Sequence, residues 1–88
     1  MNKTIDDLRK EIDALDDELM QILAKRTTVV QEIGKIKKQH KITPLDEKRW
    51  EEVLNRVFKN ARKHNVPKEL VKNIYNHIHK AALEIEQL

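Results

Sequence analysis

Two cations lie within an apolar series that runs along the first 40 residues. The series consists of Ile5, Leu8, Ile12, Leu15, Leu19, Ile22, Val29, Ile33 and Ile36. Its steps of three and four residues are typical of a helix packed along its length against other helices. Arg26 takes the position due between Ile22 and Val29, and Lys37 follows almost in phase, about 16 Å further along a helix. A guanidinium in a helical interior needs an anion, so the two cations could hold a small dianion.

The sequence offers few other groups for chemistry. It has no cysteine and no serine, and it has no glycine-rich phosphate loop. The histidines are His40, His64, His77 and His79, and no pair has metal-ligand spacing on one helix face. We therefore expect no metal and no nucleophile. A cationic pocket remains, formed by Arg26 and Lys37 with Arg49 and Arg9 as further candidates. The alternative is that Arg26 pairs with a carboxylate of a neighbouring helix and serves structure only.

Three helices are expected to position these side chains. The first runs from Thr4, its N-cap, to about His40, and contains Gly34, which is either tolerated or makes room for a ligand or a neighbouring backbone. The second is expected to open at Thr43-Pro44, with Thr43 as N-cap and Asp46 at the third helical position. The third opens at Pro67 and carries apolar residues at helical spacing. The prediction is one all-α domain over residues 1–88, with one long and two medium helices.

The first helix is too long for the rest of the chain to cover. It would measure about 50 Å, whereas a compact domain of this length has a radius of gyration of about 12 Å. Its apolar seam therefore predicts a partner helix, most simply from a second copy of the chain.

Composition narrows the class of protein. Of the 88 residues, 39% are hydrophobic and 38% charged, with one glycine and two prolines, which favours long helices over a β fold. The formal net charge is +3, but acidic and basic residues alternate and aromatic residues are only 3%, so nucleic-acid binding is not favoured. The N-terminus has no apolar signal-like segment, and we expect a soluble, cytoplasmic protein with no membrane partner.

Four segments together resemble the all-helical class of chorismate mutases. They are LRKEIDALD from Leu8, LAKR ending at Arg26, IGKIK ending at Lys37, and the Asp46–Arg49 pair. The resemblance extends from Leu8 to Glu86. It implies an intertwined homodimer that rearranges chorismate to prephenate in aromatic amino-acid biosynthesis. This intramolecular Claisen rearrangement needs no cofactor and no nucleophile.

The resemblance also implies roles for single residues. Arg9, donated by the other subunit, and Arg26 would hold the substrate carboxylates. Lys37 would reach the ether oxygen and a carboxylate, and Arg49 would support the pocket. Asp46 would accept a hydrogen bond from the ring hydroxyl, although helix capping explains it nearly as well. Ala82 completes the substrate-binding set. Arg9 and Arg26 are about 25 Å apart along one helix, which fits donation across a dimer, although Arg9 could instead pair with Asp13 on the surface.

Two positions differ in how they fit the family. Glu86 stands where the family has Gln or Glu beside the ether oxygen, and an ionised Glu would repel the developing oxyanion. It can donate only when protonated, so we expect activity that falls as pH rises. Trp50 stands where many members have a Glu that binds the ring hydroxyl, and an indole only donates. Core packing is the favoured role for Trp50. The alternatives left open are an isochorismate pyruvate-lyase, an aminodeoxychorismate mutase and a non-catalytic helical dimerisation module.

Overall fold

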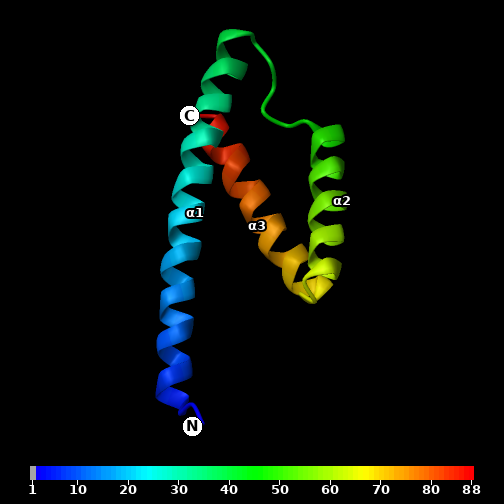
Figure 1. Cartoon of the computed structure of the whole chain (residues 1–88). Coiled ribbons are helices and arrows are strands. Elements are labelled where there is room, and N and C mark those ends of the chain that lie inside the picture. The colour runs from blue at the N-terminus through cyan, green and yellow to red at the C-terminus, as the bar shows by residue number, and fades with distance from the viewer. Residues whose placement is uncertain (1) are drawn as a thin grey trace.

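A computed structural model describes residues 2–88 and shows three α-helices and no strand in that range. They are α1 (Ile5–Gln39), α2 (Glu47–Lys63) and α3 (Lys68–Glu86). The described chain is elongated, with extents of 59 × 23 × 15 Å and a radius of gyration of 16.6 Å. In Figure 1, α3 lies between α1 and α2, and the N-terminal half of α1 extends beyond both. The predicted all-α plan of one long and two medium helices is confirmed.

The N-terminus of α1 is fixed by a capping box, as the sequence predicts for Thr4. The Thr4 hydroxyl accepts a hydrogen bond from the Asp7 N–H at 3.1 Å, and the Asp7 carboxylate accepts one from the Thr4 N–H at 3.0 Å. The hydrogen bond from the Thr4 backbone, followed by that with its side chain, lowers the pKa of Asp7. Local sequence therefore sets where α1 begins.

The predicted start of α2 is wrong by several residues. Thr43 is not the N-cap and Pro44 is not the first helical residue; the N-cap is Asp46, whose carboxylate accepts a hydrogen bond from the Arg49 N–H at 3.0 Å. Aspartate caps helices better than threonine. The preceding segment is also held outside the helix, because Lys37 Nζ donates to the Pro44 carbonyl at 2.6 Å. The helix therefore begins at Glu47.

A short hairpin of α2 and α3 contains most of the core. Its buried side chains are Val53, Val57, Ala61 and Val71, with Trp50, Phe58 and Tyr75 packed against them. Between the helices, Asn65 adopts a positive φ of 57°, and the Val66 N–H donates to the Ala61 carbonyl at 2.8 Å. Pro67 precedes α3, close to the predicted start. This core is small, so α2 and α3 leave much of α1 uncovered.

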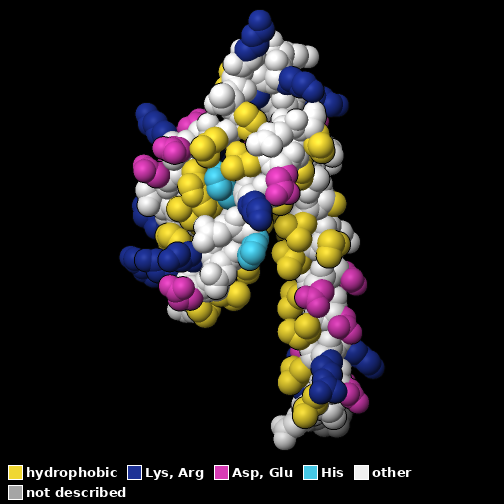
Figure 2. Space-filling model, turned by 180° about the vertical axis from the view of Figure 1, so that it is seen from behind, with side chains coloured by type: hydrophobic (Ala, Val, Ile, Leu, Met, Phe, Trp, Pro, Cys, Tyr) yellow, Lys and Arg dark blue, Asp and Glu magenta, His cyan; other side chains and the backbone are white. Residues whose placement is uncertain are grey.

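The apolar seam of α1 is exposed along its length. Its nine large side chains are between 42% and 68% accessible, and they are Ile5, Leu8, Ile12, Leu15, Leu19, Ile22, Val29, Ile33 and Ile36. Figure 2 shows apolar side chains in a column along the N-terminal half of α1, with charged side chains beside it. A contiguous apolar strip of this kind marks an interaction surface. No helix within residues 2–88 is long and apolar enough to cross a membrane.

Candidate active site

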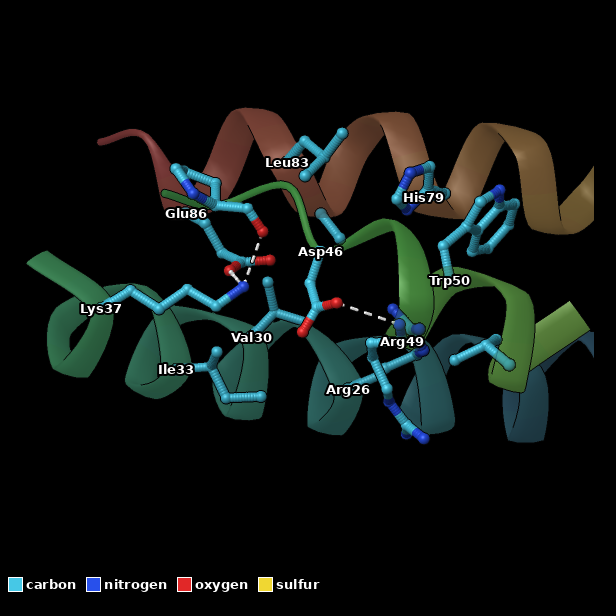
Figure 3. A pocket seen from close by; sticks show the side chains of 13 residues that line it. Arg26, Val30, Ile33, Lys37, Asp46, Arg49, Trp50, His79, Leu83 and Glu86 are labelled. Carbon is cyan, nitrogen blue, oxygen red and sulfur yellow. Dashed lines mark hydrogen bonds and ion pairs between the residues drawn. The ribbon is translucent and has the colours of Figure 1, made fainter. Parts of the chain in front are cut away.

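A pocket of about 260 Å³ lies where α1, the segment before α2, α2 itself and α3 meet. Its walls combine cations, carboxylates, rings and aliphatic side chains, namely Arg26, Val30, Ile33, Lys37, Pro44, Asp46, Arg49, Trp50, Val53, His79, Ala82, Leu83 and Glu86. Figure 3 shows these side chains converging from the three helices. Of the eight residues predicted from sequence, the structure brings seven together here; Arg9 is the exception.

Helical periodicity explains why these residues meet. On α1 the pocket residues are Arg26, Val30, Ile33 and Lys37, and on α3 they are His79, Ala82, Leu83 and Glu86. Steps of three and four residues place each set on one face of its helix. Arg26 and Lys37 thus face the same interior, as their spacing predicts.

Lys37 and Glu86 form an ion pair at one end of the pocket. Lys37 Nζ lies 2.6 Å from Glu86 Oε1, and their side chains are only 20% and 10% exposed. The same ammonium donates to the Pro44 carbonyl. Glu86 Oε1 is fully shielded from solvent and accepts no well-aligned hydrogen bond from residues 2–88. Its partner is the Lys37 ammonium, so the ion pair is held by charge and proximity at the buried end of the pocket.

Among the three cations that line the pocket, Arg26 is the one without a protein counter-ion within residues 2–88. It is half-buried and lines the pocket, yet it forms no ion pair with any carboxylate in residues 2–88. The alternative of a structural ion pair for Arg26 is therefore not observed in the single chain. A half-buried, unneutralised guanidinium favours an anionic ligand.

Arg49 and Asp46 sit at the start of α2. Arg49 pairs loosely with Glu52 at 3.5 Å on the exposed side, and the Asp46 Oδ1 atom caps the helix. Both side chains also line the pocket. Capping therefore occupies one carboxylate oxygen of Asp46, and the group still faces the cavity.

Arg9 lies on the exposed N-terminal half of α1 and does not line the pocket. Its guanidinium is 74% exposed and lies 3.8 Å from Asp6. The expected surface partner was Asp13, which is not the observed one. Within one chain, the pocket has no contribution from Arg9.

Trp50 stacks on His79, a pocket residue that the sequence analysis considered only as a possible metal ligand. The ring centroids are 3.9 Å apart and the planes differ by 9°. Trp50 also packs against the apolar core, which agrees with the role favoured from sequence. Burial is the main cause that lowers the pKa of His79, Arg26 lowers it further, and Glu86 opposes them. The signal for His79 was its seven-residue spacing from Glu86, two helical turns on one face.

Gly34 brings α3 close to α1 beside this pocket. A Cβ at position 34 would lie 2.9 Å from the Glu86 Cα and 3.3 Å from its carbonyl oxygen. Of the two roles considered for this glycine, the structure supports room for a neighbouring backbone. The absent side chain lets the α3 backbone approach, and thereby places Glu86 next to Lys37.

The family model for chorismate mutase type II matches residues 8–87. A chorismate mutase of Methanocaldococcus jannaschii is 27% identical over 90 residues, covering all of this chain and 91% of that protein. The T-protein of Haemophilus influenzae is 53% identical over 38 residues, which is 43% of this chain and a tenth of that much longer protein. Because the family model covers nearly the whole chain, the protein belongs to the chorismate mutase type II family, a family of isomerases.

Proposed function

We propose that this protein catalyses the rearrangement of chorismate to prephenate, and that it does so as a homodimer. The observation that carries the proposal is the half-buried Arg26, which faces the pocket together with Lys37 and has no protein counter-ion within residues 2–88. Chorismate is a dicarboxylate, so its two charges suit a site with spare positive charge. Membership of the family supports the same substrate.

The reaction breaks the ether C–O bond and forms a C–C bond within one molecule. Negative charge grows on the ether oxygen as the bond breaks, and a fixed cation or donor near that oxygen lowers the barrier. Lys37 would supply the cation, and Arg26 would hold a carboxylate. The pocket would also select the compact conformer of a flexible substrate, which removes an entropic cost.

Glu86 would act beside Lys37. The two form an ion pair, so Glu86 partly neutralises the positive charge that Lys37 would offer to the substrate. A protonated Glu86 would release Lys37 and donate a hydrogen bond to the ether oxygen. An ionised Glu86 would repel the oxyanion. Under this proposal, turnover falls as the pH rises.

Dimerisation would complete the site. The exposed seam of α1 offers a long apolar surface to a second copy, and burying one large aliphatic side chain contributes about 2 kcal/mol. An antiparallel pairing would bring Arg9 of the partner subunit toward the pocket of the first chain. Its exposure in the single chain is compatible with that role.

A specific observation supports a second candidate activity. Trp50 is held in the core and on His79, so it offers no acceptor for a ring hydroxyl. Asp46 lines the pocket and remains the candidate for that role in a chorismate mutase. An isochorismate pyruvate-lyase, whose substrate carries its hydroxyl elsewhere on the ring, is the runner-up.

The deciding experiment is turnover of chorismate and of isochorismate by the same preparation at pH 5 and pH 8. Prephenate formed from chorismate, faster at pH 5, is the expected result. Salicylate and pyruvate formed from isochorismate alone would establish the lyase instead. The variant Arg26→Ala tests the role of the guanidinium. It should reduce turnover at least 100-fold while leaving the helical content unchanged. A folded dimer that turns over neither compound would refute both activities.

A further inference from the structure

We propose that His79 is a further binding residue of the pocket, and that it takes up a proton when a dicarboxylate binds. The inference rests on the proposed function, because it takes the ligand to be a dianion. It assigns a role to a residue outside the set predicted from sequence.

The position of His79 in the fold is the first argument. It lies on the face of α3 that also carries Ala82, Leu83 and Glu86, and all four line the pocket. Figure 3 shows its ring beside Trp50, toward the end of the pocket away from Lys37. His79 is thus placed to meet a ligand that also contacts Lys37.

The stack on Trp50 is the second argument. A centroid separation of 3.9 Å with nearly parallel planes covers one face of the imidazole, which fixes the ring and leaves its edge to make polar contacts. Neither ring nitrogen forms a hydrogen bond within residues 2–88. A ring that is oriented by packing and free to bond at its edge suits ligand recognition.

The charge balance of the pocket is the third argument. The charged groups that share it with His79 are Arg26 and Lys37 from α1, Asp46 before α2, Arg49 on α2 and Glu86 on α3. Three cations and two carboxylates give one net positive charge while His79 is neutral. In the proposed dimer, Arg9 of the partner subunit would raise this to two, and a bound dianion would bring two negative charges close to the imidazole. Burial and Arg26 lower the pKa of His79, so the neutral imidazole is favoured and can gain a proton when a ligand binds. An arriving dianion favours the charged imidazole.

Calorimetry with a bicyclic dicarboxylic ether that mimics the transition state tests this inference. Titrations at pH 6.5 in two buffers of different ionisation enthalpy give the number of protons taken up. The parent should take up protons, and His79→Gln should take up fewer and bind about tenfold more weakly at pH 5.5, with little change at pH 8. Glu86→Gln shows how much of the proton uptake is due to the Glu86 carboxyl group. His77→Gln, on the exposed side of α3, is the matched control.

A measurement on the unsubstituted protein guards against a variant that fails to fold. The imidazole carbon resonances, followed by NMR as a function of pH, report the His79 titration directly. Addition of the mimic should raise the pKa of His79 and leave the resonances of His77 unchanged. A parent that binds the mimic with no change in His79 would overturn this inference alone. A parent that does not bind the mimic would count against the proposed function, and would overturn this inference with it.

Discussion

The ammonium of Lys37 lies 2.6 Å from the Glu86 carboxylate, and this contact joins the C-terminal ends of α1 and α3. The same nitrogen donates to Pro44, so one side chain links both helices to the segment that leads into α2. In the free protein, Lys37 is thus engaged by the chain itself. A substrate that uses this cation has to compete with Glu86.

Glu86→Gln should therefore flatten the pH dependence of turnover. The amide keeps the size of the carboxyl group and donates a hydrogen bond at every pH, and it no longer neutralises Lys37. We expect the variant to exceed the parent in kcat/KM about tenfold at pH 8, and this difference to shrink as the pH falls. Steady-state kinetics from pH 4.5 to 9 measure this. A parent profile that is already flat would contradict the role given to Glu86.

Gly34→Ala should lower both stability and activity. In most helix interiors this change stabilises by about 1 kcal/mol. Here the new Cβ would meet backbone atoms of Glu86 at 2.9 Å, and overpacking costs about 1–3 kcal/mol. We expect a net loss of stability in urea unfolding and at least a tenfold loss of kcat. Glu32→Ala, at an exposed position two residues away, is the control and should be neutral or slightly stabilising. Unchanged kcat in a well-folded Gly34→Ala would show that the close approach does not position Glu86.

Leu15→Glu should prevent the proposed dimer. Leu15 is 57% exposed in the single chain and lies in the α1 seam. In a symmetric dimer the substitution removes two buried leucine side chains, and each contributes about 2 kcal/mol of binding free energy. The dissociation constant should therefore rise about 1000-fold. Analytical ultracentrifugation over a range of concentrations measures the change. Gln21→Glu, which adds the same charge off the seam, should leave the dimer intact. A parent that sediments as a monomer at every concentration would contradict the pairing itself.

The spacing of apolar and cationic residues was sufficient to predict three helices and the shared orientation of Arg26 and Lys37, whereas Asp46, Trp50, Ala82 and Glu86 were predicted from the resemblance to the family. Arg26 and Lys37 face one cavity because both lie on the face of α1 that the apolar series defines. Periodicity within one helix is a local property, so the sequence contains it. The exposure of the seam also agrees with the argument that the rest of the chain is too short to cover it.

The features that sequence reasoning missed depend on contacts between distant segments. The sequence predicted Thr43 as the N-cap of α2, whereas the observed N-cap is Asp46. Lys37 donates to the Pro44 carbonyl and so holds that segment outside the helix. The contact of His79 with Trp50 joins α3 to α2, and the residue spacing within either helix does not predict it. The proposed role of Arg9 likewise depends on a distant contact, because it needs a second chain.

The stability of the free protein should show the effect of His79. Its pKa in the folded protein lies below the ordinary value of 6.5, so the unfolded chain binds the proton more readily. Stability therefore falls as the pH drops below about 6.5, and the loss is complete once the pH is below the folded pKa. His79→Gln removes this contribution, so the variant should lose less stability than the parent between pH 7.5 and pH 5.5. Urea unfolding at both pH values measures the difference, and His77→Gln should behave like the parent. With the dicarboxylate mimic bound, the sign should reverse, because the ligand favours the charged ring. A parent and a His79→Gln variant with the same pH dependence, free and bound, would mean that this imidazole does not titrate with the pocket.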